Sequence, residues 1–432
     1  MKNSSVIELR QEKLQNGLSL ISNEVLDTET VAISGSIKSG AMCDEPGKFG
    51  TAELAARLLT RGTKTRSASQ ISQSIEELGA TLSFENHDET VSFSARCYFG
   101  VLDQILELIG ECLTDPAFPE EEISLYKNEI LADIKSQEDD TRASAYRKLN
   151  SIIFGKDASY GRDPLGLAED LQRLTRNDLI GFHREKYDPA TIVFAITGRY
   201  DFGHVTNQIE KTLGQSKATP PGPTSFKESP YTPQVSKVEM NHKSQIDLAL
   251  GTLGVPRASP QYYSLNLGNL ILGRLGLYGR LGKNVREEKG VAYYSYSVLQ
   301  AKLYAGQFGI FAGVNPKNVE KALLGIVQEV DRITAEPISD KELETAKRNL
   351  MGSLLLSLDT SAERVGILHD IAYYDLGLNF LERNSGILGA VTSDQVLKDC
   401  NQFMSLDRIS LVAAGPVRDS QLNLPKDLLK VA

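Results

Sequence analysis

The residues that could carry out acid, base or metal chemistry are scattered along this chain. No two of its five histidines stand four residues apart, as a zinc-binding pair on one face of a helix requires. His87 lies in the polar run 85–89, which could hold a metal but is more typical of a turn between two strands. No Ser/His/Asp or Cys/His grouping is visible. The sequence therefore gives little support to a metal-free hydrolase.

Glu53 and Arg57 are the clearest pair with a defined spacing. They stand four residues apart in an apolar, alanine-rich run, with the glutamate on the N-terminal side. This is the favourable order for an ion pair on one face of a helix. We therefore expect their side chains to meet.

A glycine-bearing segment at 268–282 precedes the residues Arg286 and Tyr293. It contains Gly268, Gly273, Gly276, Gly279 and Gly282. It has neither the GxxxxGK[ST] pattern nor a GxGxxG between a strand and a helix, so it does not indicate a nucleotide site. No nucleotide cofactor is expected.

Helical and strand patterns alternate around these residues. Ser67 and Gln70 have the spacing of a capping box, and Gly79 is placed to end that helix in a left-handed conformation. Residues 90–97 alternate as a half-buried strand, 104–113 predict a helix, and Pro119 opens a longer helix to about residue 135. The pattern predicts an α+β fold with helices on a mainly antiparallel sheet.

An internal repeat divides the chain into two homologous halves. The segment TRNDL at 175–179 leads to TIVFAITG at 191–198, and TSDQV at 392–396 leads to RISLVAAG at 408–415, an offset of 217 residues. Glu122 and Lys127 are echoed by Glu342 and Lys347 at an offset of 220. We predict domains at 1–214 and 236–432, joined by a proline-rich linker at 215–235.

Composition and charge exclude several classes of function. The 432 residues carry a formal charge of −9 with 24% charged residues, which disfavours binding to nucleic acid. The four cysteines are far apart with no CxxC, as is typical of reduced thiols. The N-terminal residues have no apolar core of a secretory signal, and no run of 18 apolar residues occurs. We therefore expect a cytoplasmic protein with no membrane partner.

Three stretches together resemble the pitrilysin/insulinase (inverzincin) peptidases, most closely the short two-domain branch that includes the mitochondrial processing peptidases. The first comprises LQNGL at 14–18, GAMCDEPG at 40–47 and GTAELAARLLTRGT at 50–63. The second begins with YGRDPLG at 160–166, and the third comprises LGRLGLYGRL at 272–281 and VREEKGVAY at 285–293. The resemblance implies two domains of the processing-peptidase fold, each with a mixed, mainly antiparallel sheet covered by helices.

The resemblance also places a degenerate metal site in the first half. Catalytic members carry H-x-x-E-H, in which the histidines bind zinc and the glutamate acts as general base. The corresponding residues here are Glu53, Ala56 and Arg57, and Asp133 stands where the family has its third ligand. A guanidinium is never deprotonated and repels the ion. We expect no metal or other cofactor in this chain, with Arg57 held between Glu53 and Asp133.

The pair Arg286 and Tyr293 is retained from the same family. The resemblance implies that the arginine holds substrate carbonyls and that the tyrosine donates to the oxyanion at the zinc site of a homologous, HxxEH-bearing partner subunit. The glycine-bearing segment resembles a stretch that approaches bound peptide. We therefore expect a non-catalytic subunit of a heterodimeric zinc metalloendopeptidase that binds extended peptides. The alternative is a structural scaffold of the same fold, like the core subunits of respiratory complexes.

Overall fold

The computed structural model describes residues 7–216, 226, 230–275, 278–418 and 422. The chain forms two compact units, each built from three segments. The first contains residues 1–134, 164–225 and 354–380, and the second contains 135–163, 226–353 and 381–432. In the described ranges, no helix is long and apolar enough to cross a membrane.

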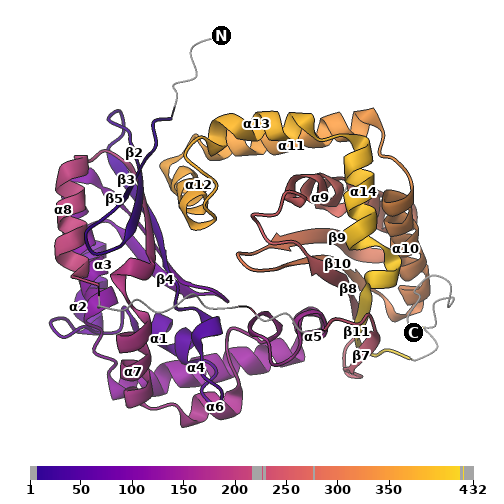
Figure 1. Cartoon of the computed structure of the whole chain (residues 1–432). Coiled ribbons are helices and arrows are strands. Elements are labelled where there is room, and N and C mark those ends of the chain that lie inside the picture. The colour runs from indigo at the N-terminus through magenta and orange to yellow at the C-terminus, as the bar shows by residue number, and fades with distance from the viewer. Residues whose placement is uncertain (1–6, 217–225, 227–229, 276–277, 419–421, 423–432) are drawn as a thin grey trace. The chain divides into compact units, whose positions relative to one another are not determined.

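The first unit is built on a six-stranded mixed sheet (Figure 1). Only the β2–β6 pair is parallel, and the other neighbouring strands are antiparallel. In sheet order the strands are β1 (Arg10–Lys13), β2 (Ser19–Glu24), β6 (Ile192–Gly198), β3 (Thr30–Ile37), β5 (Val91–Tyr98) and β4 (Thr81–Asn86). The helices are α1 (Thr51–Leu58), α2 (Ala68–Glu77), α3 (Leu102–Thr114), α6 (Ala168–Arg173), α7 (Arg176–Lys186), α8 (Phe202–Leu213) and α12 (Ser361–Tyr373). Helix α4 (Glu120–Asp139) belongs to this unit as far as residue 134.

The second unit has a five-stranded mixed sheet in which only β7 and β11 are parallel. In sheet order the strands are β7 (Val235–Glu239), β11 (Ser410–Gly415), β8 (Ile246–Gly254), β10 (Gly306–Val314) and β9 (Ala292–Ala301). The helices are α5 (Thr141–Phe154), α9 (Tyr262–Asn269), α10 (Val319–Ala335), α13 (Phe380–Ala390) and α14 (Ser393–Met404). Helix α11 (Asp340–Ser357) belongs to this unit as far as residue 353. This unit also contains π-helical turns at Leu270–Arg274 and Gly282–Glu288. Each unit combines helices with a mixed, mainly antiparallel sheet, which confirms the predicted α+β fold.

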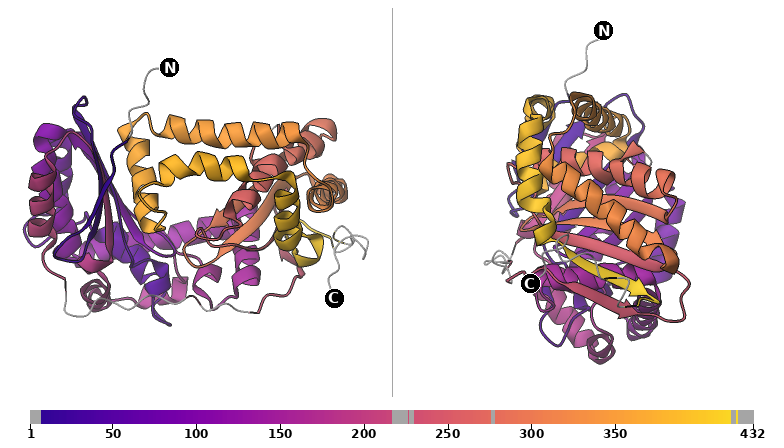
Figure 2. Two further views of the ribbon diagram at one scale, coloured as in Figure 1. Left: turned by 45° about the horizontal axis from the view of Figure 1, so that its top comes forward. Right: turned by 90° about the vertical axis from the view of Figure 1, so that its right-hand side faces the viewer.

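The central strands of each sheet are buried on both faces. In β6, Phe194 and Ile196 pack into the main core with helices such as α1 and α3, whereas Val193 and Ala195 point the other way and are also buried. That second face contacts α12, which lies on β6, β3 and β2. In the left view of Figure 2 the sheet stands between the purple helices and the orange α12. Strands that are covered on both faces have continuous apolar sequences, as residues 192–196 do.

The helices that cover these second faces are exchanged between the halves of the sequence. Helix α12 comes from the second half but packs on the sheet of the first unit, and α5 comes from the first half but packs on β8 and β11 of the second unit. They occupy equivalent places in the repeat, since Thr141 and Ser361 stand 220 residues apart. The sequence boundaries 1–214 and 236–432 remain predictions of the repeat, and the compact units differ from them in these two segments.

The local predictions agree with the structure. Ser67 and Gln70 form a capping box, and Gly79 has a φ of 58° after α2. The expected strand and helices are present as β5, α3 and α4. The run 85–89 lies at the β4–β5 hairpin connection, where the amide of His87 donates to the carbonyl of Thr90. Pro220, Pro221 and Pro223 of the predicted linker lie outside the described residues.

Candidate functional site

Helix α1 is fixed in place by the carboxylate of Asp44. Gly50, with a φ of 103°, precedes the helix, and its amide donates to Asp44 at 2.7 Å while the amide of Ala52 donates at 2.8 Å. Asp44 therefore caps two amides of the first turn and stabilises the helix start. Sequence reasoning missed this role, although Asp44 stands in the GAMCDEPG run, six residues before Gly50.

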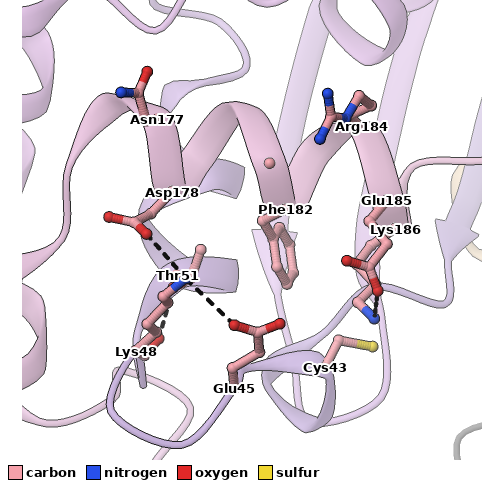
Figure 3. Close-up of a pocket in the computed structure, with 11 residues that line it drawn as sticks. Cys43, Glu45, Lys48, Thr51, Asn177, Asp178, Phe182, Arg184, Glu185 and Lys186 are labelled. Carbon is pink, nitrogen blue, oxygen red and sulfur yellow. Dashed lines mark hydrogen bonds and ion pairs between the residues drawn. The ribbon is translucent and has the colours of Figure 1, made fainter.

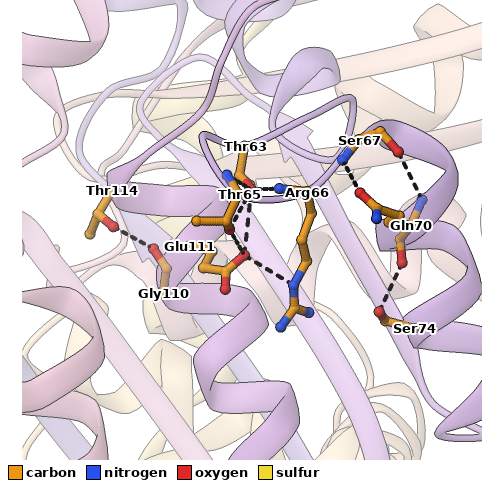
Figure 4. A network of polar contacts seen from close by, with 9 residues as sticks. All are labelled: Thr63, Thr65, Arg66, Ser67, Gln70, Ser74, Gly110, Glu111 and Thr114. Atoms are coloured by element: carbon orange, nitrogen blue, oxygen red, sulfur yellow. Dashed lines mark hydrogen bonds and ion pairs between the residues drawn. The ribbon is translucent and has the colours of Figure 1, made fainter.

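At the other end of α1, Glu111 of α3 accepts hydrogen bonds from the loop that follows (Figure 4). Its Oε2 atom lies 3.1 Å from the Thr65 hydroxyl and 3.3 Å from Nε of Arg66. The same loop leads into the Ser67 capping box. Both ends of α1 are thus held, which fixes the direction of the side chains that it carries.

Arg57 lies between two carboxylates, as expected from the sequence. Its Nε atom donates to Glu53 at 2.6 Å, and its second terminal nitrogen donates to Asp133 of α4 at 2.8 Å. The side chain of Glu53 is only 9% exposed, whereas those of Arg57 and Asp133 are 28% and 49% exposed. The Glu53–Arg57 contact is therefore largely desolvated, and the Asp133 contact is open to water.

Burial dominates the electrostatics of Glu53. Burial raises the pKa of Glu53, and the opposing effect of Arg57 and of the Asn86 side chain at the end of β4 does not cancel it. For Arg57, burial lowers the pKa but Glu53 and Asp133 outweigh it, so the pKa is raised. The guanidinium is therefore a permanent charge at this site.

These residues do not fit a zinc ion. Zinc takes thiolate, imidazole or carboxylate donors, and a catalytic site needs three of them with one open position. Here Glu53 and Asp133 both already accept from Arg57, and Ala56 offers no donor atom. Across the described part of the chain, no cluster of three or more His, Cys, Asp or Glu side chains could hold a metal.

Arg286 and Tyr293 both lie in the second unit and are exposed. Arg286 belongs to the π-helical turn Gly282–Glu288, and Tyr293 lies at the start of β9 with 59% of its surface accessible. The β9–β10 register is interrupted there: Gly313 faces Tyr294 and Val314 faces Ala292. Tyr293 is therefore the extra residue of a β-bulge, a device that redirects a side chain and is common beside active sites.

The glycine-bearing segment is tied to its surroundings at two points. Arg280 donates to both carboxylate oxygens of Glu342 in α11, at 2.9 and 3.1 Å. A Cβ atom at Gly273 would lie 2.5 Å from the backbone nitrogen of Ser297 in β9, so only glycine fits there. The segment can pack directly on the strand that carries Tyr293.

Comparison with known proteins agrees with this architecture. Residues 20–161 match the family described as Insulinase (Peptidase family M16), and residues 173–350 match the one described as Peptidase M16 inactive domain. The chain belongs to the M16 peptidase family. Identification from the three sequence stretches is thereby confirmed.

Several M16 relatives align over most of the chain. An uncharacterized zinc protease of Streptomyces coelicolor is 26% identical over 96% of this chain and 91% of its own length. One of Bacillus subtilis is 24% identical over 83% of this chain and 86% of its own. A solved peptidase M16 inactive domain from Pseudomonas fluorescens superposes with a TM-score of 0.88 at 24% identity, covering 95% of this chain and 98% of that one. A protease from Helicobacter pylori gives 0.86 at 18% identity, with 95% and 100% covered. At these identities the solved structures establish the fold.

The M16 chain also has a pocket of about 360 Å³ beside α7 (Figure 3). Lys48 reaches into it and pairs with Asp178 at 3.0 Å and with Glu45 at 3.3 Å, while Lys186 pairs with Glu185. Because these charges pair with one another, we assign the pocket no ligand. The candidate functional residues of this M16 chain form two separate groups, the Arg57 cluster in the first unit and the Arg286/Tyr293 pair in the second.

Proposed function

We propose that this chain is the non-catalytic, substrate-binding subunit of a zinc metalloendopeptidase that cleaves peptides. A homologous partner subunit with an intact H-x-x-E-H motif supplies the zinc and the general base. This chain supplies Arg286 and Tyr293. The observation that carries the proposal is the combination of an arginine bound by both carboxylates at the metal position with an exposed Arg/Tyr pair.

The exposed phenol of Tyr293 suits the role of an oxyanion donor. A hydroxyl aimed at developing negative charge stabilises the transition state more than the substrate. The guanidinium of Arg286 offers several fixed donors to peptide carbonyls. A tyrosine buried in packing could not donate to a substrate oxyanion. Tyr293 is exposed, and the bulge turns its ring away from the regular alternation of β9.

Peptide binding is supported by the sheet edges. Strand β4 is the last strand of the first sheet and β9 the last of the second, so each has one side without a ladder partner among the described strands. An extended peptide can pair with such an edge through its backbone, while alternate side chains enter neighbouring pockets. These two edge strands carry Asn86 on β4 and Tyr293 on β9.

Reconstitution with a partner tests the proposal. The purified chain alone should hydrolyse an unfolded peptide negligibly. Mixing it with a homologous H-x-x-E-H subunit should produce activity that a zinc chelator abolishes, with a maximum at equimolar subunits. The control uses the same partner with the Arg286→Ala, Tyr293→Phe variant of this chain. Equal activity with and without the chain, or chelator-resistant activity of the chain alone, would refute the proposal.

A scaffold role predicts a different outcome in the same experiment. A scaffold would restore the partner's stability without changing its turnover, and the Arg286→Ala, Tyr293→Phe variant would serve as well as the unchanged chain. Measuring complex formation by sedimentation together with turnover separates the two functions. Formation of the complex with normal turnover by the variant would favour the scaffold.

A further inference from the structure

The residue after Tyr293 is also a tyrosine, and the two point in different directions. Tyr294 is partly buried and lies on the face of the sheet that α5 covers, whereas Tyr293 is exposed. Because the residues are identical, the strand's own sequence does not decide which of them is turned outward. A shift of the bulge by one residue would exchange their places.

Contacts across three strands determine which of the two tyrosines is turned inward. Tyr294 of β9 faces Gly313 of β10, and Gly313 in turn faces Asp247 of β8. The Tyr294 hydroxyl reaches over the glycine and donates to Oδ1 of Asp247. A Cβ atom at Gly313 would lie 2.4 Å from the Tyr294 ring, so the ring occupies the space that only glycine leaves open.

Asp247 is a buried acceptor with a complete set of partners. It is 2% exposed, and its carboxylate also accepts from the Thr141 hydroxyl of α5 and from Nε2 of Gln245 at 3.0 and 3.1 Å. A buried carboxylate needs such donors, and hydrogen bonds to a charged group are stronger than neutral ones. Burial and the neighbouring Asp247 raise the pKa of Tyr294, so its hydroxyl keeps the proton that it donates.

We propose that Tyr294, Gly313 and Asp247 form a latch across three strands that positions Tyr293 for the oxyanion. The latch selects Tyr294 as the inward tyrosine and thereby fixes the bulge that presents Tyr293. Tyr294 is a positioning residue and does not touch substrate. The role at the oxyanion rests on the proposed function, whereas the fixed bulge is a property of this chain alone.

A double-mutant cycle in the reconstituted complex tests the kinetic part. Tyr294→Phe keeps the ring and removes the donor, and we expect kcat to fall by about 10–10²-fold with little change in KM, since a misplacement of about 1 Å can cost 10²-fold. In the Tyr293→Phe background, the same change should cost almost nothing further. Gly313→Ala, which crowds the Tyr294 ring, should reproduce the loss.

Tyr296→Phe is the matched control. Tyr296 lies two residues further along the same face of β9 and accepts from Arg142, whereas the described side-chain donors to Asp247 are Thr141, Gln245 and Tyr294. Tyr296→Phe, which removes only the hydroxyl, should lower the stability of the second unit about as much as Tyr294→Phe while leaving kcat unchanged. Equal kcat losses in both variants, or additive losses of Tyr293→Phe and Tyr294→Phe, would show a general loosening of the strand and overturn the latch.

Hydrogen exchange of the uncomplexed chain separates the latch from the proposed function. Tyr294→Phe and Gly313→Ala should speed exchange in peptides covering 290–297, and Tyr296→Phe should leave the bulge amides protected. If Tyr293→Phe leaves kcat unchanged, the proposed function fails while accelerated exchange still supports the latch. Unchanged exchange in Tyr294→Phe would refute the latch whatever the kinetics show.

Discussion

Removing the charge of Arg57 should destabilise the first unit in a pH-dependent way. Arg57→Met keeps much of the apolar stem and removes the guanidinium, so Glu53 remains buried without its partner. Breaking a fully buried ion pair costs about 3–5 kcal/mol. The half-exposed Asp133 contributes at most about 1 kcal/mol, as surface pairs do. Because Arg57 is itself 28% exposed, we expect about 2–3 kcal/mol at pH 8.

The sign of the pH dependence follows from Glu53. Its folded pKa is already raised, so its contribution to stability is present at low pH and is lost as pH rises through that pKa. Without Arg57 the folded pKa rises further, and the stranded carboxyl can take up a proton in mild acid. The destabilisation should therefore shrink from pH 8 to pH 5. Adding Glu53→Gln to Arg57→Met should recover most of the loss at pH 8.

Exchange protection within the first unit is the appropriate measurement. The chain has two units, so one global transition does not report on α1 alone. Native-state hydrogen exchange of peptides from α1 and α3 gives the local free energy of opening. Equal losses at pH 5 and pH 8, or no recovery in the double variant, would contradict the ion-pair account of Arg57.

Three further predictions concern the other site residues. Metal analysis should find no stoichiometric zinc in the chain, whereas the variant Glu53→His, Ala56→Glu, Arg57→His should bind about one zinc ion, because it restores two histidines four apart. Tyr293→Phe should lower kcat of the reconstituted enzyme by about 10²–10³-fold, measured at saturating peptide, and an unchanged kcat would assign Tyr293 a packing role. Burial raises the pKa of Glu342, but Arg280 and Ser339 outweigh it and hold the pKa at about 2. Glu342→Gln should therefore cost about 1–2 kcal/mol at pH 7, measured by native-state hydrogen exchange of peptides from α11, and the difference should fade as pH drops from about 4.5 towards 2.

The sequence predicted features that depend on near neighbours. The Ser67 capping box and the Glu53–Arg57 pair follow from spacings of three and four residues, which a helix converts directly into contact. Asp133 stands 76 residues after Arg57 in the sequence, and their contact was predicted only from the family resemblance. Such contacts need knowledge of how helices pack, which local spacing does not contain.

Other features were beyond reach for physical reasons. Strand alternation treats Tyr293 and Tyr294 as ordinary neighbours, so the bulge and the choice between them depend on Asp247, 47 residues from Tyr294. The repeat shows that α5 and α12 are equivalent but not which sheet each covers. Both questions are settled by packing between distant segments rather than by local preference.

The exchanged helix α12 has a consequence for synthesis on the ribosome. The sheet of the first unit is complete in sequence at Gly198, yet the helix that covers its second face ends only at Tyr373. At a translation rate of about 5–20 residues per second, residues 199–373 take roughly 10–35 s to synthesise, and α12 cannot cover that face before then. During this interval Ile21, Val193 and Ala195 lie on an open apolar surface. We therefore expect a ribosome-associated chaperone to bind the nascent chain until residues 361–373 have emerged.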